Sequence, residues 1–231
     1  MLRLLIIWLF RHYRQKQNIK KPSALISPKN KRQLPLAGSV VFVMLLVFAT
    51  KSFGQSKTHN YQIIRNGSKV GTLQFSEGLN GEIDHLKMVS DVKTRFVFTF
   101  TAHAIEEAVY QNGVLLRSSI YRTLNGSEKA NKQHEANNKQ YIIHAGERSE
   151  VTKNYPITYS MLSLYSREPE GINKVYSDNF QTFIPIVKLD PHKYKITLPD
   201  GNYNYYYYKD GVLVLIEVHH SFYSANIALI N

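Results

Sequence analysis

The sequence predicts a mostly β protein, built as a single curled antiparallel sheet that forms a closed or partly open barrel with one short helix. Two observations lead to this prediction. Asn-Gly or Asp-Gly pairs, which suit tight type I′ hairpin turns, occur six times. The segments between the pairs alternate apolar and polar residues, as half-buried strands do. The pairs begin at Asn66, Asn80, Asn112, Asn125, Asp200 and Asp210.

The alternation places strands along most of the chain after residue 60. Between Arg95 and Ala104 the even-numbered residues are phenylalanine or alanine, whereas the odd-numbered ones include threonine and histidine. Val212 to Val218 is apolar on both sides, as in a central strand. We expect strands at 60–66, 69–76, 82–91, 94–111, 114–124, 127–136, 139–145, 181–187, 193–198, 202–209, 212–219 and 222–230.

One stretch has helical rather than strand periodicity. Its apolar residues recur at i, i+4, i+7 and i+8, with Thr158 available as N-cap and Pro169 shortly after the end. The stripe comprises Ile157, Met161, Leu164 and Tyr165. Because so many strands cannot leave long bare edges, the sheet is expected to curl into a barrel with this helix covering a gap. A two-layer sandwich fits the same pattern.

The chain begins with a leader that divides it into three parts: a basic N-terminal extension at 1–33, a signal peptide or membrane anchor at 34–54, and an exported β domain at 55–231. Residues 34–50 are uncharged and follow a basic region, and Ser52 and Gly54 suit cleavage before Gln55. An uncleaved apolar helix over 34–50 is the alternative, and it would anchor the protein in the inner membrane. Both readings export the C-terminal part, because basic residues cluster before the apolar run.

The net charge of +12 comes almost entirely from the leader. Residues 1–54 hold ten Lys or Arg and no acidic residue, so the rest has nineteen basic and seventeen acidic residues. Since the basic residues of that rest are scattered, the stripe that nucleic-acid binding requires is missing, and no nucleic-acid partner is expected. Absence of cysteine removes disulfides and thiolate chemistry and favours a bacterial envelope location, in the periplasm.

No catalytic motif is found, so we expect no enzyme activity, no cofactor and no metal site. The nine histidines lack ligand spacing, and His134-Glu135 has no second histidine to complete a zinc motif. His219 and His220 are adjacent on a strand and point to opposite faces, as do Glu106 and Glu107. These carboxylates therefore do not form an acid–base pair.

Tyrosine is the conspicuous polar residue of the exported part. On a strand, Tyr203, Tyr205 and Tyr207 share one face, and Tyr206 and Tyr208 share the other. Such ladders either line a pocket for a sugar, lipid or peptide or stabilise the sheet through cross-strand aromatic pairs. We take Tyr203, Tyr205 and Tyr207 as candidate ligand-binding residues.

The order of these features resembles an uncharacterised family of exported bacterial antiparallel-β proteins of unknown function. The resemblance rests on four blocks: YQIIRNGSKVG from Tyr61, YQNGVLLRS from Tyr110, ITYSMLSLYSREP from Ile157 and LPDG from Leu198. In layout the chain is also similar, more distantly, to periplasmic curled-sheet or half-barrel domains. The resemblance implies a compartment and a fold but no activity. As a site, Tyr159, Tyr165 and Glu168 of the third block would be polar groups at the mouth of the barrel.

These observations lead to two main hypotheses. The first is a non-enzymatic, β-barrel-like binding module for an apolar or amphiphilic ligand, or for an envelope protein, in the concave face. The second is a structural or interaction module with a filled core, tethered to the membrane through residues 34–50 if the leader is uncleaved. They differ in whether the inward faces of the strands at 96–104 and 203–208 leave a cavity of a few hundred Å³, roughly the size usual for ligand sites.

Overall fold

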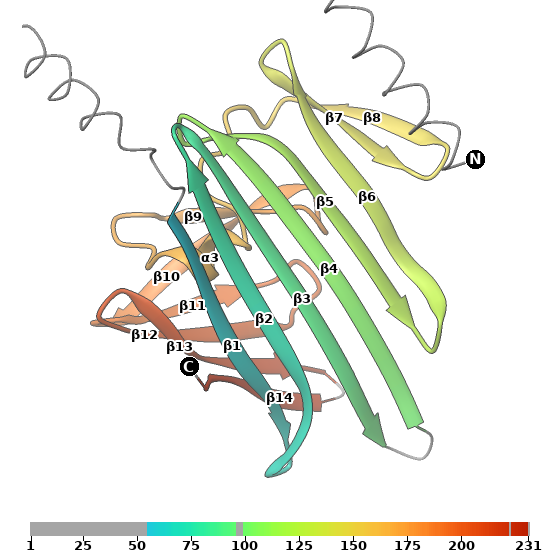
Figure 1. The fold of residues 1–231 in the computed structure, drawn as a ribbon, viewed down its shortest axis with the longest axis vertical. Coiled ribbons are helices and arrows are strands. Elements are labelled where there is room, and N and C mark those ends of the chain that lie inside the picture. Colours follow the sequence, from blue (N-terminus) through green and yellow to red (C-terminus); the bar gives the residue numbers. More distant parts are fainter. Residues whose placement is uncertain (1–54, 96–98, 222, 231) are drawn as a thin grey trace, which may run out of the picture. The chain divides into compact units, whose positions relative to one another are not determined.

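The computed structural model describes residues 55–95, 99–221 and 223–230, which form one antiparallel sheet of fourteen strands and one helical turn (Figure 1). Each strand pairs with the next along the chain except that β8 does not pair with β9; β1 also pairs with β14, and β8 and β9 are the two edges. The elements are β1 (Gln55–Arg65), β2 (Ser68–Asn80), β3 (Ile83–Arg95), β4 (Thr99–Gln111), β5 (Val114–Leu124), β6 (Ser127–Asn137), β7 (Gln140–Ala145), β8 (Arg148–Thr152), α3 (Ser163–Ser166), β9 (Lys174–Ser177), β10 (Thr182–Asp190), β11 (Lys193–Thr197), β12 (Tyr203–Lys209), β13 (Val212–His220) and β14 (Tyr223–Leu229).

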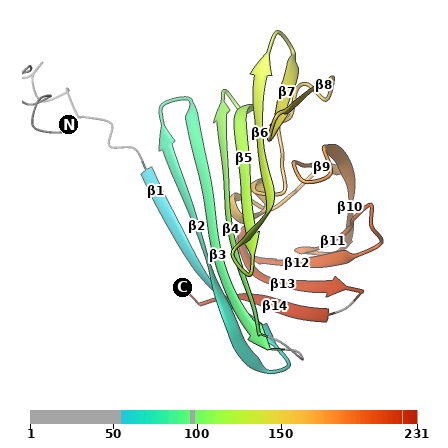
Figure 2. The same ribbon diagram turned by 90° about the vertical axis from the view of Figure 1, so that its right-hand side faces the viewer.

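The sheet curls but does not close. In Figure 2, β9–β13 bend round to face β3–β6, so the sheet has a concave and an outer side. The prediction of a curled antiparallel sheet in a partly open barrel is confirmed, and the closed form is wrong because β8 and β9 remain separate edges. The fourteen strands belong to one sheet, so the two-sheet sandwich is not formed. The expected leader helix at 34–50 lies outside the described residues.

The hairpin turns follow the sequence pattern closely. At Asn66-Gly67 both residues have positive φ, 49° and 75°, as a type I′ turn requires. The same holds for the pairs that begin at Asn112, Asn125 and Asp210, whereas at the pairs beginning at Asn80 and Asp200 only the glycine has positive φ. Asn138-Lys139 also has positive φ at both residues, at a turn that contains no glycine to indicate it.

Two strands and the extent of the helix were not predicted. β8 is exposed along most of its length and β9 has four residues, so neither carries a readable alternation. The helix has one turn, begins after Leu162 and has no side-chain cap, so the expected start near Ile157 with Thr158 as N-cap is wrong. The residues before the turn are extended and pair with β9: the Tyr176 amide donates to the Tyr159 carbonyl at 2.9 Å. That pairing replaces the hydrogen bonds of a longer helix.

The segment between β8 and β9 crosses the concave side and joins the two halves of the sheet. The Leu115 amide of β5 donates to the Ile157 carbonyl at 2.8 Å, and the Tyr208 hydroxyl of β12 donates to the Leu164 carbonyl at 2.8 Å. Both Ile157 and Leu164 are fully buried. The largest fully buried side chains around them are Tyr61, Phe75, Leu86, Tyr141, Tyr176, Tyr194 and Ile196. This core closes one end of the concave space. No helix in the described ranges has the length and apolar character needed to cross a membrane.

Candidate functional site

A cavity of about 230 Å³ lies on the concave side, between β3–β5 on one half of the sheet and β12–β14 on the other; because charged side chains stand in its mixed lining, we call it the polar cavity. Strands supply most of its wall, and the segments at 161–165 and 177–180, together with Leu198, supply the rest. The residues that matter for its chemistry are Glu106, Arg122, Tyr165, Asp178, Phe180 and Tyr206. A space of this kind, enclosed by strands from both halves of a curled sheet, is a natural place for a ligand.

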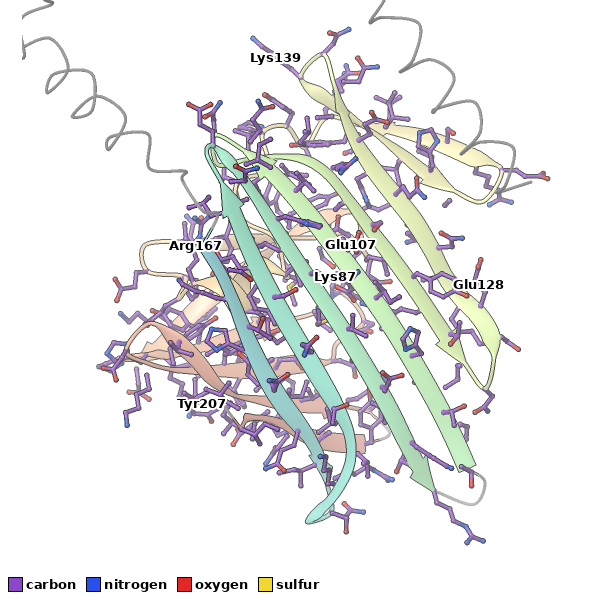
Figure 3. All side chains as sticks on the ribbon, in the orientation of Figure 1. Lys87, Glu107, Glu128, Lys139, Arg167 and Tyr207 are labelled. Atoms are coloured by element: carbon purple, nitrogen blue, oxygen red, sulfur yellow. The ribbon has the colours of Figure 1, made fainter. Side chains whose placement is uncertain are left out.

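The alternation of β4 places one of two consecutive glutamates in this cavity. Glu106 faces the concave side with the Arg122 side chain, whereas Glu107 faces outward and forms an ion pair with Lys87 at 2.7 Å. Figure 3 shows Lys87 and Glu107 side by side over β3 and β4. The opposite orientation of Glu106 and Glu107 confirms the expectation from the strand pattern.

Glu106 and Arg122 form an ion pair inside the cavity. The Arg122 Nε and Nη2 atoms both donate to the same carboxylate oxygen, Oε1, with the Nε bond at 3.2 Å. The Glu106 side chain is 13% exposed and that of Arg122 is 38% exposed. The positive charge of Arg122 therefore offsets the negative charge of Glu106. The second carboxylate oxygen of Glu106, Oε2, takes no part in these bonds.

Asp178 brings a second carboxylate to the same cavity. It follows β9, and its Oδ1 accepts a hydrogen bond from the Ser118 hydroxyl of β5 at 2.5 Å. Burial, with a smaller effect from the nearby Glu106 carboxylate, raises the pKa of Asp178 to about 6. In the same loop, Lys132 Nζ of β6 donates to the Asn179 carbonyl at 2.9 Å. These bonds hold the loop after β9 against the concave face of β5 and β6.

His134 lies beside Asp178 and is completely buried. Its Nδ1 is 3.3 Å from Asp178 Oδ1, but neither ring nitrogen makes a hydrogen bond of acceptable geometry among the described residues. Burial, and to a smaller degree Lys132, lowers the pKa of His134 to about 4, so the ring is neutral at pH 7. Ser118 donates its proton to Asp178 and not to a histidine. The arrangement therefore does not activate Ser118 as a nucleophile in the manner of a catalytic triad.

An apolar cavity of about 370 Å³ adjoins the polar one at the other end of the concave face. Val218 and Ile227 line both cavities, so the two are neighbours. Arg65 and Thr94 are polar members of the lining and bond each other at 3.4 Å. The main apolar lining comes from Ile63, Val92, Phe100, Leu124, Ala225 and Ile227. Together the cavities offer an apolar end and a charged end on one concave surface.

The candidate residues around α3 lie in different places. Tyr165 borders the polar cavity, with its ring stacked on Phe75 at 5.7 Å between centroids. Tyr159 is buried and donates to the Arg167 carbonyl at 2.5 Å. Glu168 does not line this cavity; its side chain is 6% exposed and accepts a hydrogen bond from the Tyr194 hydroxyl at 2.7 Å. The structure therefore does not bring these three together in one pocket.

The tyrosine ladder of β12 is divided between the two sides of the sheet. Tyr203, Tyr205 and Tyr207 are on the outer side, where Lys195 lies 4.5 Å from the Tyr203 ring centre and Lys193 lies 5.1 Å from that of Tyr207. Tyr206, on the opposite side, lines the polar cavity. The outer tyrosines thus alternate with lysines, a pattern that stabilises the sheet through cation–π contacts.

Glu168 also belongs to a group with metal-ligand side chains. In the described part of the chain, ligand atoms of Glu168, Glu170 and His192 all lie within 4.8 Å of one another. His192 Nδ1 is 3.0 Å from Glu168 Oε2, a hydrogen-bond distance. Glu170 and His192 are exposed, so water and this hydrogen bond satisfy them without an ion, and we assign no metal here.

Ser118, His134 and Asp178 were missed by the sequence reasoning. His134 lies in a stretch, NKQHEANNK, that reads as polar on every face, although Ala130, Lys132, His134 and Ala136 share its inward side. Asp178 follows a strand too short to recognise. The alternation of alanine with polar residues in β6 was the only sequence signal for the inward face.

Comparisons with known proteins give a family and a likeness to a solved structure. Residues 61–230 match the family described as "Domain of unknown function (DUF6134)". No curated protein matches the chain. The crystal structure of a beta-barrel-like protein of domain of unknown function DUF1849 from Brucella abortus is similar at 9% identity and a TM-score of 0.48, covering 78% of this chain and 97% of that one.

Proposed function

The chain belongs to the DUF6134 family of domains of unknown function, and from its own geometry we propose that its concave face binds a single-chain amphiphile. The observation that carries the proposal is the apolar cavity of about 370 Å³ next to the polar cavity. Ligand pockets typically have volumes of roughly 300–1,000 Å³ and combine an apolar lining with a few polar groups. Each methylene group of a chain buried there contributes about 0.8 kcal/mol.

The core of the sheet is a reason to expect a preformed pocket. Tyr61, Leu73 and Phe75 fill the concave side of β1 and β2 near α3, whereas the far ends of these strands border the apolar cavity. The lining combines the large side chains of Phe100, Leu124 and Tyr223 with the small ones of Ala102 and Ala225. Small residues at these two positions leave room for a ligand.

Ala225→Phe tests the cavity directly. Ala225 lines it from β14, so a phenylalanine there should displace the apolar part of a ligand. We expect the variant to bind the neutral, apolar dye Nile red at least tenfold more weakly. A tenfold change corresponds to about 1.4 kcal/mol of binding free energy. Fluorescence titration of the full chain measures this affinity.

Ala228→Phe is the matched control on the same strand. Ala228 pairs with Gln62 of β1 and Leu215 of β13 and lies on the outer side, away from the cavity. The affinity of the Ala228→Phe variant for Nile red should equal that of the wild type. Equal affinities of the Ala225→Phe variant and the wild type, or no saturable Nile red binding by the wild type, would refute the proposal.

We also propose that the domain acts in the bacterial envelope after export. This part rests on the leader alone, with its uncharged run at 34–50 and the small residues Ser52 and Gly54. The denatured mass of the protein recovered from the periplasm should correspond to a chain beginning at Gln55. A full-length chain found only in the membrane fraction would mean that residues 34–50 are an uncleaved membrane anchor. A full-length chain in the cytoplasm would contradict export.

A further inference from the structure

We propose that the ligand of the concave face carries a cationic ammonium head group, held in the polar cavity between Glu106 and Asp178. This inference rests on the proposed function and specifies its ligand class. The cavity contains two carboxylates, Glu106 and Asp178, and one cation, Arg122. An anionic head group would add a further negative charge to this set, whereas an ammonium group would balance it.

The hydrogen bonds of the cavity leave each carboxylate an oxygen that can accept from a ligand, so an ammonium group is favoured by the charge balance and by these acceptors. Arg122 already donates two hydrogen bonds to Glu106 Oε1, and Ser118 donates to Asp178 Oδ1. Among the described residues these side-chain donors engage Glu106 Oε1 and Asp178 Oδ1 and leave Glu106 Oε2 and Asp178 Oδ2, while the Asp178 carboxylate also accepts from its own backbone amide. An ammonium group has three donors and no acceptor, so it complements these oxygens.

Aromatic rings complete the site. Tyr165, Phe180 and Tyr206 line the same cavity as the two carboxylates. The negative face of an aromatic ring attracts a cation within about 6 Å, and rings grouped around a carboxylate are a common means of recognising ammonium ligands. The apolar cavity next to this group then receives the chain of the same molecule, which would lie along Val218 and Ile227, the two residues that line both cavities.

The charge state of the site at neutral pH supports the proposal. Burial raises the pKa of Asp178 to about 6, so its carboxylate is ionised at pH 7.5. The groups that face it are Glu106 on β4, Ser118 and Arg122 on β5, and His134 on β6. Because His134 is neutral at this pH, it does not offset the second carboxylate.

Competition for bound Nile red tests the head group with three probes of one chain length: dodecylamine, dodecanol and dodecanoate. At pH 7.5 we expect dodecylamine to displace the dye from the full chain at a concentration at least tenfold lower than dodecanoate does, with dodecanol between them. Glu106→Gln should weaken dodecylamine about tenfold and strengthen dodecanoate, because it leaves Arg122 without its partner. Asp178→Asn should weaken dodecylamine and leave dodecanol unchanged.

Glu107→Gln is the matched control, one residue along β4 with its side chain on the outer side. It removes the same charge from the protein and should not change the order of the three probes. Equal displacement by the three probes, or tighter binding of dodecanoate to the wild type, would overturn the inference while leaving the proposed function intact. Failure of Nile red itself to bind would instead refute the proposed function.

Discussion

Asp178→Asn is expected to make the stability of the protein fall steeply as the pH decreases from about 6.5 to about 4. His134 has its pKa lowered from 6.5 to about 4 by burial, so the stability it contributes is present above 6.5 and is lost as the pH falls through 4. Asp178 has its pKa raised from 3.8 to about 6, so its contribution is present below 3.8 and is lost as the pH rises through 6. In the wild type the two effects oppose each other between about 4 and 6.

Each single variant should reveal the effect of the remaining group. A pKa difference of about 2 units corresponds to roughly 3 kcal/mol. We therefore compare each variant with the wild type as the pH is lowered from about 6.5 to about 4. Over this range the free energy of unfolding of the Asp178→Asn variant should fall by about 3 kcal/mol relative to that of the wild type. The free energy of unfolding of the His134→Gln variant should rise by a similar amount relative to that of the wild type. Urea unfolding of the three proteins at several pH values measures the differences, in which the other titrating groups cancel. Parallel curves for all three would contradict the effect of burial on the pKa values of His134 and Asp178.

Gly71→Ala should destabilise the protein by about 3 kcal/mol, because the strands leave no room for a side chain there. A Cβ atom on Gly71 would lie 2.3 Å from the carbonyl oxygen of Asp91 and 3.0 Å from the Val92 Cα, both in the backbone of β3. The backbone must therefore move apart at this point.

β1 and β2 also shift register beside Gly71, and Val70 next to it lines the apolar cavity. A bulge of this kind changes the direction of a side chain, here that of Val70, which faces the apolar cavity.

Gly78→Ala in the same strand is the matched control. Nothing lies within 4 Å of a Cβ atom at Gly78. The free energy of unfolding of the Gly78→Ala variant should stay within about 1 kcal/mol of the wild-type value, because alanine meets no clash there and makes the unfolded chain less flexible. Thermal or urea unfolding of both variants checks the contrast. Equal stabilities of the two variants would show that β2 and β3 are not in close contact at Gly71.

The sequence predicts the strands well and the shape of the sheet poorly. Asn-Gly turns and period-two alternation are local, so the hairpins of β1–β7 and β10–β14 could be read from neighbouring residues. How far the sheet curls depends on contacts between distant segments, such as the Lys132 bond to the Asn179 carbonyl. These contacts have no local signature, and the prediction therefore left open and closed barrels undecided.

The candidate site, too, could be predicted from the sequence only in part. Alternation correctly separates Glu106 from Glu107 but does not say which of them faces inward, and Tyr165 was selected for a different reason but borders the cavity. Asp178 could not be found, because it is brought to Glu106 by the return of the chain across the concave side. In β12 the alternation correctly separates Tyr205 from Tyr206, but the sequence does not say which of the two faces is concave. Sequence pattern fixes which side chains share a face, and only the fold identifies the enclosed face.

The most direct test of a ligand in the concave face is a methyl NMR titration of the full chain with dodecylamine, with isoleucine and methionine methyl groups labelled. Ile227 lines both cavities and Met88 lines the polar one, whereas Ile64 lies on the outer side of β1. We predict saturable shifts at Ile227 and Met88 and none at Ile64. Shifts that spread over the outer face, or no change at Ile227, would contradict a ligand site between the two halves of the sheet.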